Sequence, residues 1–244
     1  MNRDALIHPD ELNLDQVIKI TQHRPDLRAD CGNQLVGPSD PCEPGLLAAD
    51  EITIRAESIL RVHGYKKPEA TPATIRELAF TIANNTEGLF TPSVRHQEHA
   101  IESCSEGILR LANGVELRCG DFGALVDCTS AVAFVLTIGD GVDQKVHNHA
   151  AAGDVVEALF LETAAWLAIE AATRKFVLSL RDKATRRGLG LTRRFAPGYS
   201  DWALSEQRYL FSLLSGTQLP VQLLESGAML PKMSRSGLYG LRRL

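Results

Sequence analysis

The feature that most constrains the fold is a long, mostly apolar helix predicted from about Asp154 to Leu180. Over its N-terminal two-thirds, apolar residues occur almost all round the helix, so packing against a single neighbour would not cover them. Asp154 and Glu157 have the spacing of a capping box, which predicts that the helix begins there. We therefore expect this helix to form the buried spine of a domain.

The stretch between Asn85 and Gly139 instead has the pattern of β-strands. Its short apolar runs are separated by glycines, and the Asn113-Gly114 pair is a strong signal for a tight hairpin. The run Ala131–Ile138 is almost continuously apolar and predicts a central strand, and Met229–Leu241 predicts a strand pair. Because helices and strands are segregated along the chain, we predict an α+β fold: an antiparallel or mixed sheet with flanking helices and one long buried helix.

Three shorter helices are predicted before and after these strands. The first runs from Asp50 to Gly64, where a glycine in the left-handed conformation would end it. The second follows Pro72, and the third spans Asp201–Leu214. These are the flanking helices of the predicted fold.

Residues 1–48 differ in composition from the rest of the chain. They hold five of the eleven prolines, eight acidic and four basic residues, and one helical patch at Leu12–Thr21. Such a segment offers little apolar area to offset the entropy lost when a chain becomes ordered. We therefore divide the chain into a partly irregular N-terminal extension, 1–48, and a single domain, 49–244.

Composition excludes several classes of function. With 26 Lys and Arg against 30 Asp and Glu, the net charge is −4, without the basic excess that binding to phosphate backbones usually needs. No apolar stretch approaches the ~20 residues of a membrane-spanning helix. The chain starts with Met-Asn-Arg-Asp rather than an apolar signal core. We expect a soluble cytoplasmic protein that binds neither nucleic acid nor membranes.

The cysteines and histidines do not predict a metal site. The five cysteines have irregular spacing that matches neither a zinc site nor an iron–sulfur cluster, which predicts free thiols. The pairs His96/His99 and His147/His149 lack a nearby Cys or acidic cluster at suitable spacing. We interpret them as surface histidines.

The segment Arg193–Trp202 holds the densest group of candidate binding residues. Pro197-Gly198 demands a turn, with two arginines before it and Tyr199 directly after it. An arginine offers a bidentate fork to a carboxylate, and a tyrosine offers a stacking face or a hydroxyl. The same pattern fits a plain strand-to-helix turn with Ser200 or Asp201 as N-cap. From the residues alone, ligand binding and a structural turn are equally good interpretations.

The arrangement Arg-x-x-Pro-Gly-Tyr, ending at Tyr199 and followed about thirty residues later by Ala228–Tyr239, resembles the reactivation (activation) domain of cobalamin-dependent methionine synthase. In particular, it resembles the free-standing proteins related to that domain. Gly64–Lys67, Thr137–Gly139 and Ala168–Ala171 fit the same family. The resemblance covers about residues 50–241 and leaves the extension without a counterpart.

The resemblance implies binding of S-adenosylmethionine and docking onto a corrinoid-carrying partner, a methionine synthase or a related corrinoid protein. The partner's oxidised cobalamin would be reduced, for instance by a flavodoxin-like protein, and remethylated. No catalytic side chain is implied in this domain, because the corrinoid chemistry happens on the partner. The cofactor-binding residues carried over are Glu170, Arg194, Ala196 (through its backbone), Tyr199 and Tyr239. The family's acidic contact near the start of the domain, an aspartate before a tryptophan, has no counterpart here.

The charges of this ligand agree with that set. S-adenosylmethionine carries a sulfonium, an ammonium and a carboxylate, so its site needs an arginine fork and acidic neighbours. Arg194 and Glu170 supply one of each. Glu170 shares a helical stripe with Leu159, Trp166 and Val177, where an unpaired carboxylate would be costly. Its other interpretation is an ion pair with residue 174, one turn further along the helix.

Two other functions fit the sequence. Val135–Asp143 faintly resembles the glycine-rich loop of a stand-alone methyltransferase, but it lacks the third glycine and the alternating strands and helices that should follow. The second alternative is a scaffolding protein that has kept the fold but no longer binds the ligand. The absence of a counterpart to the family's aspartate is consistent with this alternative.

Residues 174–194 carry eight Lys or Arg and one Asp, a local charge of +7. Such a run fits a solvated helix end, where cations favour the helix dipole. It also fits a surface that steers a negatively charged partner such as a flavodoxin or an acidic corrinoid protein.

Overall fold

The computed structural model describes residues 43–46, 52–86, 88–214 and 218–244. Within them, seven strands form one antiparallel sheet in the order β4-β3-β2-β5-β9-β6, and β1 pairs with β2. A separate two-stranded sheet joins β7 and β8. The strands are β1 Glu43–Leu46, β2 Ser93–Ser105, β3 Ile108–Leu111, β4 Glu116–Arg118, β5 Cys128–Thr137, β6 Leu189–Leu191, β7 Gln222–Leu223, β8 Met229–Leu230 and β9 Ser234–Arg243.

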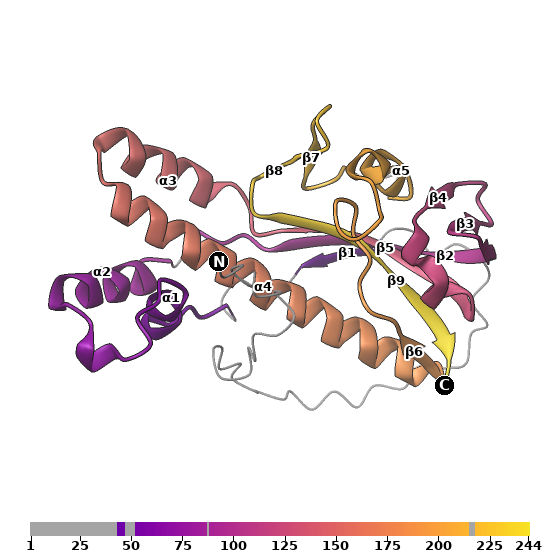
Figure 1. The fold of residues 1–244 in the computed structure, drawn as a ribbon, viewed down its shortest axis with the longest axis horizontal. Helices are drawn as coiled ribbons and strands as arrows, with labels where there is room; N and C mark the ends of the chain where they lie inside the picture. Colours follow the sequence, from indigo (N-terminus) through magenta and orange to yellow (C-terminus); the bar gives the residue numbers. More distant parts are fainter. Residues whose placement is uncertain (1–42, 47–51, 87, 215–217) are drawn as a thin grey trace, which may run out of the picture.

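The helices cover both faces of this sheet, so the predicted α+β class is confirmed. Figure 1 shows α4 running along one face of the sheet, with α1 and α2 beside it and α3 folded back along its N-terminal part. Helix α5 lies on the opposite face. The helices are α1 Ala56–Val62, α2 Ala73–Asn84, α3 Gly141–Ala152, α4 Val155–Arg186 and α5 Gln207–Ser212, with short 3₁₀ helices at Pro68–Ala70, Gly120–Leu125 and Leu204–Glu206.

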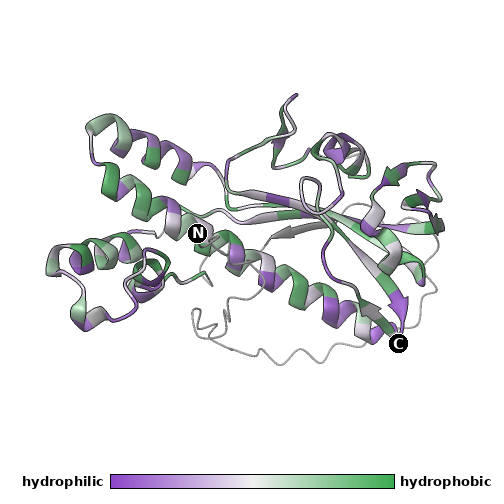
Figure 2. Cartoon of the chain, viewed as in Figure 1, coloured by the Kyte–Doolittle hydropathy of each residue, from purple (hydrophilic) through white to green (hydrophobic). Residues whose placement is uncertain are grey.

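Strand β5 separates two apolar cores. Because side chains alternate along a strand, Val132, Phe134 and Leu136 pack toward α4. The residues between them, Ala131, Ala133 and Val135, pack on the opposite face. Both faces of this strand are therefore buried, which explains why its sequence is apolar throughout. Figure 2 shows the hydrophobic residues that line the centre of the sheet.

The prediction of a buried spine is confirmed for most of α4, which has fifteen buried residues in the described chain. The helix continues to Arg186, six residues beyond the predicted end. The capping-box prediction is wrong: Asp154 occupies the N-cap position but makes no side-chain capping bond, and its Oδ2 lies 3.5 Å from Nδ1 of His149. The first turn is also less buried than predicted, since Val155 and Val156 are exposed.

Two predicted turns are confirmed. The predicted hairpin joins β3 to β4, with Gly114 at φ +85°. Gly64, at φ +86°, follows α1 as predicted, although α1 starts at Ala56 rather than Asp50. Helix α2 follows Pro72 as expected.

Two predicted elements differ from the structure, and one helix was not predicted. Only Gln207–Ser212 of the predicted helix Asp201–Leu214 is α-helical, because the chain before it makes a turn that buries Trp202. The predicted strand pair Met229–Leu241 divides into β8 and β9, which pair with β7 and β5 instead of each other. The glycine-rich loop around Gly139 leads into α3, a helix that was not predicted.

The N-terminal extension is described only at β1. This strand pairs with β2 through Glu43↔His96 to Leu46↔Ser93, so four residues of the predicted extension join the sheet. The helical patch Leu12–Thr21 lies outside the described residues, as do Cys31 and Cys42. No helix in the described part of the chain is long and apolar enough to cross a membrane.

The histidines of β2 are more buried than predicted. The ring of His96 lies edge-on to Phe176 of α4, at 5.4 Å between ring centroids. His99 faces the opposite side, where Nε2 lies 2.9 Å from the backbone oxygen of Leu213. The two rings are therefore on different faces of the sheet and cannot share a ligand.

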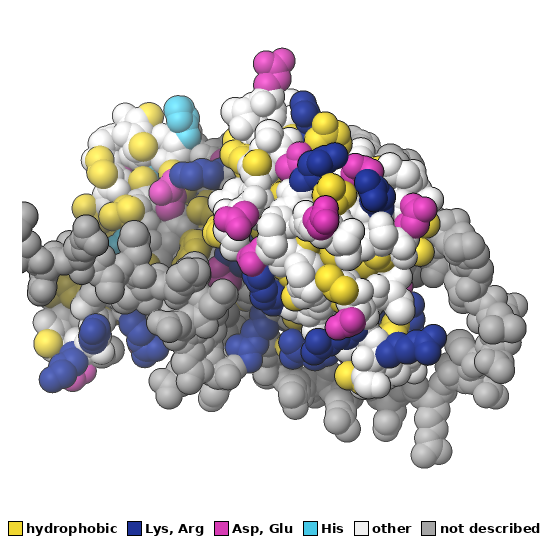
Figure 3. All heavy atoms as spheres, turned by 45° about the vertical axis from the view of Figure 1, so that its right-hand side comes forward, with side chains coloured by type: hydrophobic (Ala, Val, Ile, Leu, Met, Phe, Trp, Pro, Cys, Tyr) yellow, Lys and Arg dark blue, Asp and Glu magenta, His cyan; other side chains and the backbone are white. Residues whose placement is uncertain are grey.

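Charge on the surface is mixed. Figure 3 shows Lys and Arg side chains interspersed with Asp and Glu over the face that carries β3, β4 and α5.

Candidate functional site

The Pro-Gly turn after β6 forms one wall of the candidate site. Gly198 has φ +86° and Ser200 has φ +50°, so two residues of this turn are in the left-handed region. The backbone N–H of Gly198 donates to the oxygen of Trp202 at 2.7 Å. The side chain of Trp202 is buried on the face of the sheet opposite α4 and anchors the turn. This turn leaves Tyr199 62% exposed beside the pocket described below.

Strand β9 holds the chain before the turn. The N–H of Phe195 donates to Leu238 at 2.9 Å, and the N–H of Leu238 donates back to Phe195 at 2.8 Å. Gly237 makes this approach possible, since a Cβ there would lie 2.6 Å from the oxygen of Phe195 and 3.1 Å from Cγ of Arg194. Gly237 therefore has a steric role: it lets the segment that carries Arg194 and Phe195 lie directly against the sheet.

A pocket of about 370 Å³ lies between this turn, α4 and the segment that leads into β9. That volume is within the usual range for sites of small molecules. Arg194, Ala196 and Tyr199 line it together, so the structure brings three of the five predicted residues to one pocket. The guanidinium carbon of Arg194 lies 5.8 Å from the centroid of the Tyr199 ring, close enough for a cation–π contact.

Glu170 joins the site through an arginine. Its carboxylate pairs with the guanidinium of Arg235, which lines the pocket, and the two side chains are 14% and 21% exposed. The partner was not predicted, because Arg235 is 65 residues away in the chain. A second pair of this kind joins Lys232, also in the pocket lining, to Glu162 of α4. The pocket therefore has cations in its wall and carboxylates directly behind them.

Tyr239 lies in the core rather than in the pocket lining. It is 4% exposed, and its ring stacks on Phe134 at 5.4 Å between centroids. Burial raises the pKa of its hydroxyl to about 12, although the positive charge of Arg194 opposes this shift. The structure thus places Tyr239 beneath the site's arginines, as part of the core that supports them.

Arg193 and Arg194 have different surroundings. The guanidinium of Arg193 donates to Asp121 Oδ2 at 2.7 Å and lies 4.5 Å from the centroid of the Phe195 ring. The hydrogen bonds from Arg193 and Ser200 hold the pKa of Asp121 below its usual value. Arg193 therefore ties the turn to the 3₁₀ helix Gly120–Leu125, whereas Arg194 lines the pocket.

Sequence reasoning missed part of the pocket lining. Trp166 and Ile169 of α4 are three residues apart, so they lie on the same helical face toward the pocket. Met229, Lys232 and Met233 come from the segment before β9, which belongs to the motif Ala228–Tyr239 but was assigned no contact with the ligand. The helical spacing of Trp166, Ile169 and Glu170 was the available signal for the α4 side.

No protein-family model and no curated protein matches the sequence. A solved structure does match it: the crystal structure of the MetH reactivation domain bound to AdoHcy. The TM-score is 0.60, and the match covers 82% of this chain and 78% of that chain. The chain has the fold of the MetH reactivation domain.

The two proteins share 14% sequence identity, so the likeness to the MetH reactivation domain is one of fold. It agrees with the resemblance found in the motifs around Tyr199 and Tyr239. The sheet of this chain is antiparallel. A stand-alone methyltransferase with a glycine-rich loop, the alternative given above, would instead be expected to have parallel strands that alternate with helices.

Proposed function

We propose that this protein is an S-adenosylmethionine-binding activation module that supports the reductive remethylation of a corrinoid held by a partner protein. One observation carries the proposal: Arg194, Ala196 and Tyr199 line a single pocket in a fold shared with the MetH reactivation domain, which was solved with AdoHcy bound. Glu170 and Tyr239 do not line the pocket, and we assign them indirect roles. Glu170 holds Arg235 of the pocket wall, and Tyr239 belongs to the core that supports the site.

The chemistry of the pocket lining fits the ligand. The fork of Arg194 suits a carboxylate, and the faces of Tyr199 and Trp166 suit an adenine ring or a sulfonium. The carboxylates of Glu162 and Glu170 pair with Lys232 and Arg235 of the pocket wall, and they partly offset the positive charge that these cations present to the ligand's ammonium and sulfonium groups. S-adenosylmethionine supplies the methyl group, and the partner's reduced corrinoid is its acceptor.

The role of this chain is to bind and orient. A module of this kind needs no catalytic side chain, because positioning the methyl donor against the acceptor is its contribution to the rate. The partner is a corrinoid-binding methionine synthase or a related corrinoid protein, with a flavodoxin-like protein as the source of electrons.

Titration calorimetry with S-adenosylmethionine and with AdoHcy tests the binding half of the proposal. We expect the wild-type protein to bind both, and Arg194→Ala to bind about ten- to a hundredfold more weakly, since a charge-assisted hydrogen bond is lost. Arg193→Ala is the matched control, because its guanidinium is held by Asp121. No heat and no thermal shift at millimolar ligand would contradict the proposal, and equal effects of the two variants would contradict the assignment of Arg194.

A methyl-transfer assay tests the rest. Transfer from S-adenosylmethionine is expected only when the corrinoid partner, a one-electron reductant and this protein are present together. Release of S-adenosylhomocysteine with a small acceptor and no corrinoid would instead support the methyltransferase alternative.

A further inference from the structure

The charges that line the candidate pocket are all of one sign. In the described part of the chain, its lining contains the cations Arg194, Lys232 and Arg235 and neither an aspartate nor a glutamate. The glutamates that pair with two of these cations, Glu162 and Glu170, belong to α4 but not to the lining. A ligand in the pocket therefore meets cationic side chains directly and carboxylates only through their ion pairs.

Arg194 differs from the other two cations in having no carboxylate partner. Among the residues that the structure describes, Lys232 pairs with Glu162 and Arg235 pairs with Glu170, whereas no ion pair is formed by Arg194. Three cations and two partner carboxylates leave the pocket with a net charge of +1. This excess positive charge lies at the arginine proposed to bind the ligand's carboxylate.

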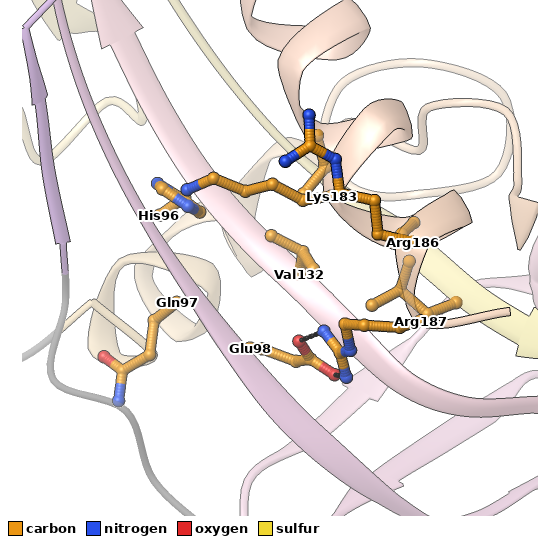
Figure 4. A pocket seen from close by; sticks show the side chains of 10 residues that line it. His96, Gln97, Glu98, Val132, Lys183, Arg186 and Arg187 are labelled. Carbon is orange, nitrogen blue, oxygen red and sulfur yellow. Dashed lines mark hydrogen bonds and ion pairs between the residues drawn. The ribbon is translucent and has the colours of Figure 1, made fainter. Parts of the chain in front are cut away.

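The other cavity along α4 has a different arrangement of charge. It is formed by the last turns of α4 and by β2, and Glu98 of β2 belongs to its lining. Figure 4 shows the carboxylate of Glu98 paired with the guanidinium of Arg187, with N–O distances of 2.6 and 2.9 Å. A lining without carboxylates is thus a property of the candidate pocket and not of every cavity beside this helix.

The two ligands of the proposed function differ by one positive charge. AdoHcy, the thioether left when S-adenosylmethionine gives up its methyl group, carries an ammonium and a carboxylate, and S-adenosylmethionine carries a sulfonium as well. Arg194 can pair with the carboxylate of either ligand. No carboxylate of the described lining then remains for the sulfonium, and a cation without a partner is costly in a partly desolvated site.

The aromatic rings of the pocket offset little of this cost. Tyr199 already has the guanidinium of Arg194 at 5.8 Å from its ring centroid, so a second cation there would be repelled. The ring of Trp166 is the other aromatic face of the described lining, and a cation–π contact is weaker than a charge-assisted ion pair.

We propose that this pocket selects its ligand by charge and binds AdoHcy more tightly than S-adenosylmethionine. The spent cofactor then occupies the pocket when both are present at equal concentrations, which makes AdoHcy a regulator of the module. This inference rests on the proposed function, because it concerns the same pocket and the same pair of ligands. The side chains that adjust the preference are Lys232 and Glu162, whose ion pair lies at the edge of the site.

The experiment is calorimetric titration of the full chain with each ligand in 0.15 M salt. The ratio of the two dissociation constants is compared, because any loss of folded protein or of a shared contact affects both ligands alike. We expect the wild type to bind AdoHcy on the order of tenfold more tightly, as for one unpaired charge near a protein surface. Lys232→Gln removes a cation and should bring the ratio close to one, and Glu162→Gln should raise it above the wild-type value.

The matched controls are Arg186→Gln and Asp182→Asn. These residues form another ion pair with exposed side chains, and their substitution changes the net charge by the same amounts. Asp182 lies twenty residues after Glu162 on α4, about 30 Å along the helix axis, which is several times the Debye length of about 8 Å. The ratio should therefore stay at its wild-type value in both controls.

The possible failures are distinguishable. Equal binding of the two ligands by the wild type, or tighter binding of S-adenosylmethionine, would overturn the charge selection and leave the proposed function standing. Shifts of the ratio in the controls as large as those in Lys232→Gln and Glu162→Gln would also overturn it, since net charge alone would then be responsible. Binding of neither ligand at millimolar concentration would contradict the proposed function, and this inference with it.

Discussion

Gly237→Ala is expected to destabilise the strand crossing that positions Arg194. A Cβ at this position would lie 2.6 Å from the backbone oxygen of Phe195 and 3.0 Å from Cε1 of Phe134. A backbone oxygen cannot rotate away as the end of a flexible side chain would. The segment that carries Phe195 must therefore move off β9.

The cost follows from the contacts that this movement breaks. The two hydrogen bonds between Phe195 and Leu238 contribute about 0.5–1.5 kcal/mol each. Keeping them instead would leave an overpacked contact, which costs about 1–3 kcal/mol. The two costs do not add in full, because movement relieves the clash, and alanine gains about 0.5–1 kcal/mol over glycine within a strand. We expect a net loss of about 1–2 kcal/mol in the free energy of unfolding.

Urea unfolding followed by tryptophan fluorescence measures this loss. The matched control is Gly123→Ala, because Gly123 has an ordinary φ and no atom within 4 Å of the position a Cβ would take. The control should unfold at the wild-type urea concentration or slightly above it. If Gly237→Ala also unfolds at the wild-type midpoint with an unchanged slope, the steric argument is refuted. Weakened ligand binding in Gly237→Ala is a second expected consequence, since Arg194 moves with the segment.

Three further predictions concern the site, the pH dependence and the extension. Glu170→Ala leaves the guanidinium of Arg235 without its carboxylate, so the free energy of unfolding should fall by about 1–3 kcal/mol, and the double variant Glu170→Ala/Arg235→Ala should recover part of it. Burial lowers the pKa of His63, so the neutral imidazole is favoured in the folded state. The contribution of His63 to the free energy of unfolding should be fully present above about pH 6.5 and should decrease as the pH falls toward the lowered pKa of the folded state. Stability profiles of His63→Gln should be flatter there. A chain starting at Glu43, which keeps β1 in the sheet, should bind S-adenosylmethionine as the full chain does in calorimetry; loss of binding would show that the residues before β1 contribute a contact.

Much of the fold could be predicted because its signals are local. The period of α4, the apolar run of β5 and the Asn113-Gly114 turn each depend on a few neighbouring residues. The predictions were wrong where a segment's structure depends on distant packing. Trp202 is buried against Phe122, about eighty residues earlier, and that burial replaces the first turns of the predicted helix with a turn.

The candidate site divides in the same way. The sequence by itself determined that an arginine, a turn and a tyrosine are adjacent at 194–199, because they are covalent neighbours. Only the tertiary structure decided that Glu170 meets Arg235, that Gly237 lies under Phe195, and that Tyr239 belongs to the core. These contacts depend on strand order and register, which join residues tens of positions apart and leave no trace in local spacing.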